Sequence, residues 1–329
     1  MKAYDVMTVD AVGMPFTGST PELQGLGGSE WEQILLLEEL ARRGYRVAAM
    51  NRVSAWSRVN GVDYLPLGMV EYDVPPAERV IFMRNTPHQR RPDWHRHARW
   101  ITDNAPDEET GPLEVVCVSD WQAKTCRPLE QSEVIHNMLP DWVYDLPHTR
   151  NTPAQSFIYA SAAMKGLRET LAYFAQMKAT KEYRNATLTV CSPGYDRPDK
   201  IEQPGVTWKG ALPFAALVEE MQQHRSLLHV STCPETFGIA HVLAETLGLN
   251  VFVLRTAGPD ALSEVLVSPV YDNIGHFNAA LTTHGDYPQQ WKPFTAKEYR
   301  QSRIVDEWCR VLGLERVAQH VKEQAQAYT

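Results

Sequence analysis

With 329 residues, the chain exceeds the usual size of one hydrophobic core, so two domains are expected. Its composition, 43% hydrophobic and 22% charged, is typical of soluble globular proteins, and no apolar run reaches the roughly 18 residues of a transmembrane helix. The net charge of -8 argues against general attraction to nucleic acid or anionic membranes, so such a partner would need a local basic patch.

The start of the chain lacks the apolar stretch of a secretory signal, which predicts a cytoplasmic location. The five cysteines are scattered and include no C-x-x-C pair. This spacing argues against a disulfide framework and against a zinc cluster.

The first half alternates strand and helix signals. A short strand at 4–9 leads through a glycine-rich loop containing Gly27 and Gly28 to an expected helix, for which Ser29 is a suitable N-cap and Gly44 the stop. Further short apolar runs, typical of a parallel sheet with crossovers, lie at 47–51, 80–84, 99–102 and 115–119. The pattern predicts an α/β domain over 1–145.

Pro140, Pro147 and Pro153 punctuate an aperiodic stretch that we interpret as the interdomain linker. A second α/β domain is expected over 153–302, with strand signals at 157–160, 187–191, 227–230 and 251–254 and helix signals at 166–177 and after Gly238. The end of the chain has the period of an amphipathic helix, which we expect at 303–329 and assign to the N-terminal domain.

The segment around Glu235 and Gly238 carries the strongest chemical signal. A strand ends in a turn that starts a helix, so backbone N–H groups near Phe237, Gly238 and Ile239 point outward at the positive end of the helix dipole. Such a helix start suits a diphosphate, and Glu235 could accept hydrogen bonds from sugar hydroxyls. The alternative is that Glu235 only caps a structural helix.

This segment resembles the E-x-F-G-(I/L)-x-x-x-E-A-x-x-x-G-x-P-V signature of a large family of retaining glycosyltransferases. The family, glycosyl transferases group 1, includes the phosphatidylinositol mannosyltransferases and the sucrose synthases. Other pieces follow in the family's order: the loop Gly27-Gly28-Ser29-Glu30 and the segments 116–121, 134–137, 160–167 and 206–210.

The resemblance implies the GT-B fold, in which two Rossmann-like domains face each other across a cleft. It also implies retention of anomeric configuration without a metal ion, no cofactor, and a UDP- or GDP-linked sugar as co-substrate. Lys165 would neutralise the donor diphosphate and Glu235 would hold the sugar. The remaining donor-binding positions would be Gly27, Gly28, Gly210, Leu212, Thr236, Phe237, Gly238, Ile239 and Leu243.

Three positions depart from the family pattern. Leu243 stands where a second glutamate takes the ribose hydroxyls, and Glu245 lies about 200 degrees further around the helix, so it is no substitute. The arginine that accompanies the lysine is absent, which leaves Arg255 as a candidate. Thr102 stands where many relatives have a histidine, so the predicted catalytic residues are Glu235, Lys165 and Asp103, with His88 as an alternative base.

The segment 84–100 gathers five arginines, three histidines and two tryptophans against one acid. We predict that it binds an anionic acceptor, either a phospholipid head group or a nucleic-acid backbone. Its alternative interpretation is a solvated loop and helix face. The expected acceptor-binding residues are Arg84, His88, Arg90 and Arg91, and the spacing of His95 and His97 is too weak to predict a metal site.

The predicted function is therefore a glycosyltransferase that transfers a sugar from a nucleotide sugar to a hydroxyl of a lipid or saccharide. A modified nucleic-acid base is the second choice of acceptor. A catalytically silent nucleotide-sugar-binding module and a nucleotide-sugar 2-epimerase remain as alternatives.

Overall fold

The computed structural model describes residues 3–68, 75–87, 91, 94–102, 114–125, 132–146, 152–192, 199–284 and 297–314. The predicted site residues Asp103, His88 and Arg90 lie outside these residues, as does the predicted helix beyond residue 314. None of the described helices is both long enough and apolar enough to cross a membrane.

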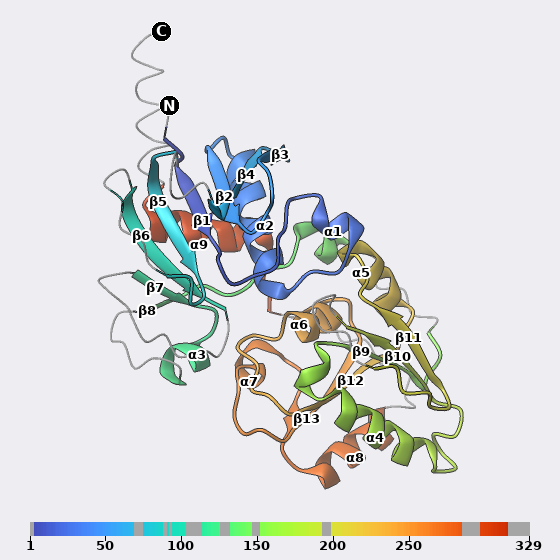
Figure 1. The fold of residues 1–329 in the computed structure, drawn as a ribbon. Coiled ribbons are helices and arrows are strands. Elements are labelled where there is room, and N and C mark those ends of the chain that lie inside the picture. The colour runs from blue at the N-terminus through green and yellow to red at the C-terminus, as the bar shows by residue number, and fades with distance from the viewer. Residues whose placement is uncertain are drawn as a thin grey trace.

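The described strands form two sheets, one in each lobe of Figure 1. The first sheet has the order β3-β4-β2-β1-β5-β6-β7-β8 and is parallel except for the pair β3 and β4. Its strands are β1 (Val6–Val9), β2 (Val47–Asn51), β3 (Ser57–Val59), β4 (Val62–Pro66), β5 (Ala77–Met83), β6 (Trp94–Ile101), β7 (Glu114–Cys117) and β8 (Ser132–Val134). The helical segments within this part are α1 (Thr20–Leu23), α2 (Gly28–Arg42), α3 (Asp120–Thr125) and η2 (Asp141–Asp145).

The second sheet is parallel throughout, with the order β11-β10-β9-β12-β13-β14. Its strands are β9 (Ser156–Ala160), β10 (Thr187–Cys191), β11 (Val206–Gly210), β12 (Ser226–Ser231), β13 (Asn250–Arg255) and β14 (Val270–Tyr271). The helical segments that follow them are η3 (Ala163–Lys165), α4 (Leu167–Lys178), α5 (Phe214–Gln222), α6 (Ile239–Thr246), α7 (Leu262–Val265), α8 (Ile274–His284) and α9 (Gln301–Leu312).

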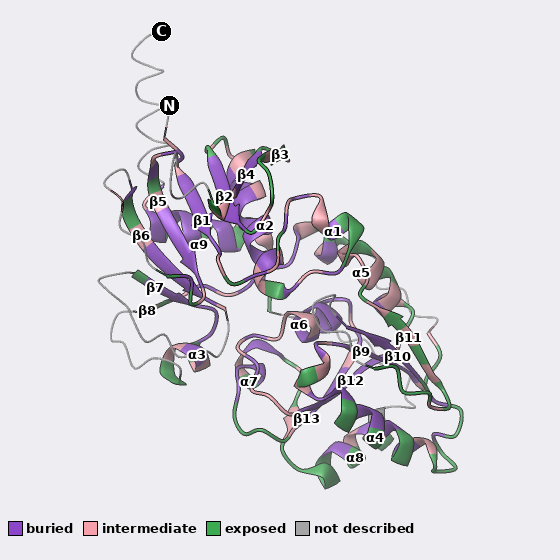
Figure 2. Ribbon diagram, in the orientation of Figure 1, coloured by how far each residue is buried: buried purple, intermediate pink, exposed green. Residues whose placement is uncertain are grey.

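Most residues of the inner strands of both sheets are buried (Figure 2). All residues of β9 and β12 are buried, which explains why these strands are apolar over most of their length rather than alternating. Parallel strands point their carboxyl ends toward one edge of each sheet, and the two sheets present these edges to each other. Ligands of such α/β sheets bind at this edge.

Helix α9 returns to the first sheet although it follows the second one in sequence (Figure 1). Its apolar face buries Trp308 against Trp100 of β6, with ring centroids 4.7 Å apart. Arg43, the C-cap residue of α2, pairs with Asp306 at 2.5 Å. The chain therefore crosses between the lobes a second time after residue 297.

Two sequence interpretations are wrong in detail. Ser29 is not the N-cap of α2, because the helix begins at Gly28 and Gly27 occupies the cap position. The basic segment is not a helix face, because 94–101 forms β6, in which Trp100 and Arg99 are buried. Arg99 is held inside by donating hydrogen bonds to the carbonyl oxygens of Arg84 and Thr86.

Candidate functional site

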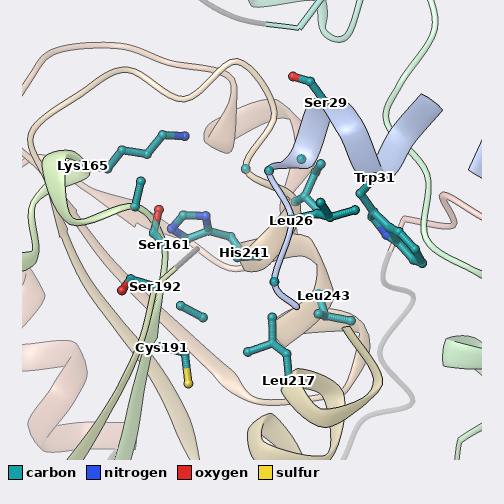
Figure 3. Close-up of a pocket in the computed structure, with 18 of the residues that line it drawn as sticks. Leu26, Ser29, Trp31, Ser161, Lys165, Cys191, Ser192, Leu217, His241 and Leu243 are labelled. Atoms are coloured by element: carbon teal, nitrogen blue, oxygen red, sulfur yellow. The ribbon is translucent and has the colours of Figure 1, made fainter. Parts of the chain in front are cut away.

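A cavity of about 600 Å³ lies between the two sheets and is lined by both lobes. Figure 3 shows part of its lining. The predicted residues that the structure brings together around it are Gly27, Gly28, Arg84, Lys165, Gly210, Leu212, Glu235, Thr236, Gly238, Ile239 and Leu243. Phe237 is buried in the core instead, against Tyr299, and Arg91 lies over the ring of Trp94.

The turn between β12 and α6 positions Glu235. Gly238 has a φ of 80°, and a Cβ there would come within 2.4 Å of the side chain of Leu262, so glycine is required at the start of α6. Asp260 supports the turn, because its carboxylate accepts hydrogen bonds from the backbone N–H groups of Glu235 and Leu262 at 3.4 and 3.1 Å. The first N–H groups of α6 have no acceptor inside the helix.

Lys165 and Glu235 form an ion pair in the cavity, with 2.7 Å between Nζ and Oε2. The carboxylate side chain is only 4% exposed, whereas the lysine side chain is 35% exposed. Burial by itself would raise the pKa of Glu235, but the charge and hydrogen bond of Lys165 outweigh it and leave the pKa lowered. Glu235 is therefore an ionised hydrogen-bond acceptor at neutral pH.

Two buried histidines lie behind this ion pair. Nε2 of His229 is 2.8 Å from the carbonyl oxygen of Lys165, and Nδ1 of His229 is 2.6 Å from Nε2 of His241. The carbonyl can only accept, so His229 carries its proton on Nε2, and its Nδ1 accepts from the Nε2–H of His241. This chain of hydrogen bonds ties the backbone of Lys165 to α6.

Acidification should destabilise the protein through this histidine pair. Burial first and the charge of His229 next lower the pKa of His241 from 6.5 to about 3. As pH falls below about 6.5, His241 becomes protonated in the unfolded chain but stays neutral in the folded protein. Its contribution to the free energy of unfolding is therefore fully present above that pH and is lost progressively toward pH 3. From pH 7 to pH 5, His241 alone should lower the free energy of unfolding by about 2 kcal/mol.

Denaturant titrations at the two pH values measure this effect. The His241→Gln variant should lose less stability between pH 7 and pH 5 than the wild type, because glutamine does not titrate. His276 is exposed, so His276→Gln serves as the control and should keep the wild-type pH dependence. An unchanged pH dependence in His241→Gln would show that this histidine already titrates normally in the folded protein.

The glycine loop of the first lobe closes directly onto the second lobe. A Cβ on Gly25 would lie 2.9 Å from the carbonyl oxygen of Leu212, and one on Gly28 would lie 2.8 Å from the side chain of Ile239. Beside this contact, Trp31 of α2 stacks on Phe214 of α5, with ring centroids 4.6 Å apart. These contacts join the two walls of the cavity.

No protein-family model matches the sequence, and no curated protein matches it. Solved structures do match. AviGT4, a glycosyltransferase involved in avilamycin A biosynthesis, is 12% identical with a TM-score of 0.62, over 94% of this chain and 97% of that one. Anabaena HepE in complex with UDP-glucose is 12% identical with a TM-score of 0.62, over 94% and 99% of the two chains.

WaaG, a glycosyltransferase involved in lipopolysaccharide biosynthesis, is 16% identical with a TM-score of 0.55, over 98% of this chain and 94% of that one. The matches cover both lobes and both sheets. The chain has the GT-B fold. The fold expected from the sequence is therefore confirmed, and the cavity lies between the two Rossmann-like domains of a GT-B protein.

Polar side chains from both GT-B domains meet at the first-domain wall. Ser29 Oγ is 2.6 Å from Thr102 Oγ1, and Thr236 donates to the carbonyl oxygen of Thr102 at 3.1 Å. Thr102 thus links the glycine-loop helix to the turn that holds Glu235.

Arg84 also lines the cavity, but it is already paired inside its own domain. One guanidinium nitrogen lies 2.7 Å from Asp10 and 2.7 Å from Glu30, and the side chain is 13% exposed. Gln33 also donates a hydrogen bond to Asp10 at 2.8 Å. These contacts fix Arg84 beneath the glycine loop as part of a buried polar network.

Arg255 and Glu245 were the two candidates to replace the arginine and the second glutamate of the family pattern. Both are held by other partners. Arg255 binds Asp260 at 3.0 Å and Asp272 at 2.7 Å and is not among the described residues that line the cavity. Glu245 accepts hydrogen bonds from the backbone N–H groups of Val267 and Ser268, the latter at 2.6 Å. Glu245 therefore does not supply the carboxylate that the family pattern has at the position of Leu243.

Sequence reasoning missed several residues of the site. Trp31 and Phe214 gave no signal, because their stacking joins segments far apart in the chain. His229 and His241 did give one, since each interrupts an apolar run next to the Glu235 turn. A histidine at a buried position needs a hydrogen-bond partner, and that requirement could have linked the two.

Proposed function

We propose that this protein is a glycosyltransferase that transfers a sugar from a nucleoside diphosphate sugar to an acceptor hydroxyl. The observation that carries the proposal is the ion pair of Lys165 and Glu235 at the start of α6, inside the cavity between two GT-B domains. It sets one cation, one ionised carboxylate and a helix N-terminus around a space large enough for a nucleotide sugar.

Each group has a role in this reaction. The ammonium of Lys165 and the first N–H groups of α6 stabilise the negative charge of the diphosphate as it leaves, which supports departure without a metal ion. Glu235 accepts hydrogen bonds from sugar hydroxyls and orients the ring. The histidine pair holds the backbone of Lys165 in place.

The bond changes follow from this arrangement. The acceptor oxygen forms a bond to the anomeric carbon, the bond from that carbon to the diphosphate oxygen breaks, and the diphosphate takes the acceptor proton. We propose attack on the face that the diphosphate leaves, with retention of configuration, as the family resemblance implies. Trapping a sugar covalently bound to Glu235 would exclude this course.

The acceptor is proposed to be a lipid or saccharide hydroxyl at the wall formed by Ser29, Thr102 and Thr236. A modified nucleic-acid base is the second candidate, favoured by the basic composition of 84–100. DNA binding that weakens with salt and disappears when Arg90 and Arg91 are replaced would favour the nucleic acid.

A panel of nucleotide sugars tests the function. One donor should raise the melting temperature of the wild type, and Glu235→Ala and Lys165→Ala should lose most of that shift. The same donor should be hydrolysed slowly or transferred, with EDTA having no effect. Tight binding without turnover would identify a silent binding module, and interconversion of the donor without an acceptor would identify a 2-epimerase.

A further inference from the structure

The cavity differs in character between its two ends. Lys165, Glu235 and the start of α6 supply charge and hydrogen-bonding groups at one end, and in Figure 3 Leu217 and Leu243 lie on the side opposite Lys165. The apolar side chains that line the cavity include Leu26, Trp31, Leu212, Phe214, Leu217 and Leu243. A ligand that extends past the diphosphate site therefore enters an apolar environment.

Leu243 is the member of this apolar set that lies on α6. It follows Ile239 by four residues on α6, so both side chains project from the same helix face about one turn apart. On the proposed function, on which this inference rests, the diphosphate lies at the start of α6. The donor-binding positions Gly210 and Leu212, which also line the cavity, then remain for the base. The ribose that joins them then lies against Leu243.

A ribose at this place finds no carboxylate. Among the described residues that line the cavity, Glu235 is the only acidic one, and it is paired with Lys165. The carboxylate of Glu245 is held by the N–H groups of Val267 and Ser268. In Figure 3 the hydroxyls of Ser161 and Ser192 lie on the side of the cavity away from Leu243.

We propose that the donor is a sugar linked to a 2′-deoxyribonucleoside diphosphate, of the thymidine diphosphate class. A ribose 2′-hydroxyl buried against Leu243 without a carboxylate to accept its hydrogen bond weakens binding about tenfold, and 2′-deoxyribose lacks that hydroxyl. The thymine methyl group adds apolar surface, which strengthens binding about fourfold in an apolar site. This proposal favours a thymidine diphosphate sugar over the UDP- and GDP-linked sugars that the family resemblance implies.

Four nucleotides separate the two contributions. Calorimetry measures the Kd of UDP, dUDP, 5-methyl-UDP and dTDP with the full-length wild type. We expect dUDP to bind about tenfold more tightly than UDP because it lacks the hydroxyl. We expect each methylated nucleotide to bind about fourfold more tightly than its unmethylated counterpart, which makes dTDP the tightest ligand.

Substitution of Leu243 should change the preference for the sugar of the nucleotide. Leu243→Glu supplies a carboxylate for the ribose hydroxyls, so UDP should gain at least about tenfold in affinity relative to dUDP. Leu243→Met keeps an apolar side chain of similar volume and should keep the wild-type order of affinities. Circular dichroism reports whether each variant folds. If Leu243→Glu does not fold, the four affinities measured with the wild type decide whether the site prefers deoxyribose.

The outcomes distinguish this inference from the function on which it rests. UDP binding as tightly as dUDP to the wild type would overturn the deoxyribose preference while leaving the glycosyltransferase proposal in place. No binding of any of the four nucleotides would overturn this inference alone, because the proposed function also admits a guanosine-linked donor. Only the failure of every nucleotide sugar in the panel to bind would overturn the proposed donor site. A tenfold preference for dUDP that is lost or reversed in Leu243→Glu supports both.

Discussion

Replacing Glu235 with glutamine is expected to lower kcat for sugar transfer by about 100-fold or more. The variant keeps the shape of the side chain but removes the ionised acceptor that we assign to the sugar, and it leaves the charge of Lys165 without its 2.7 Å partner. Because the lost interaction acts on the sugar as it reacts, kcat should fall more than KM rises. Steady-state kinetics with the donor found in the panel measures both values.

The matched control for this substitution lies elsewhere in the same domain. Glu220 forms an ion pair with Lys209 at 3.4 Å and does not line the described cavity. Glu220→Gln should therefore leave kcat and KM within about twofold of the wild type. A Glu235→Gln enzyme that retains more than a third of wild-type kcat would remove this carboxylate from the reaction.

Combining the substitution with Lys165→Met tests whether the two residues act as a unit. Lys165→Met alone should also lower kcat strongly, because the diphosphate loses its cation. The double variant should be little worse than either single variant, as for groups that contribute to one transition state. Strictly additive losses would indicate that Lys165 and Glu235 act independently.

Gly166→Ala is expected to destabilise the fold by roughly 3 to 5 kcal/mol, the second large effect. Gly166 has a φ of 119°, and a Cβ there would lie 1.9 Å from the carbonyl oxygen of Val230. Backbone atoms must move to admit it, and neither β12 nor the start of α4 is free to shift. The midpoint of urea denaturation measures the loss.

Gly44→Ala is the matched control, because Gly44 has a φ of 94° and a Cβ there would meet nothing within 4 Å. The Gly44→Ala variant should lose only about 1 kcal/mol of stability, because alanine there adopts the left-handed conformation without a steric clash. The difference between the two variants isolates the close approach to Val230. Equal losses would contradict that approach, and with it the position assigned to Lys165, the residue before Gly166.

Several fold elements could be predicted from the sequence because their signals are local. The runs at 47–51 and 187–191 match β2 and β10. Buried parallel strands appear as short apolar runs bounded by turn residues, and this pattern needs no knowledge of distant neighbours. The alternation of these runs with helices indicated two α/β domains, and the structural matches confirm the GT-B fold.

The segment 84–100 shows where local signals fail. Its many cations indicated an exposed surface, yet β6 lies between β5 and β7, and Arg99 is only 2% exposed. The guanidinium of Arg99 tolerates burial because the backbone carbonyl oxygens of Arg84 and Thr86, just after β5, accept its hydrogen bonds. Those acceptors are placed by sheet pairing, which the order of residues along the chain does not reveal.

The sequence by itself determined the Glu235 turn, the glycine at its helix start and the lysine before Gly166, because turn chemistry and helix starts depend on neighbouring residues. Only the tertiary structure decided that Lys165 meets Glu235, that His229 bonds His241 and that Trp31 stacks on Phe214. Each of these contacts joins separate elements of the chain, and it forms only when sheet order and domain packing bring those elements together.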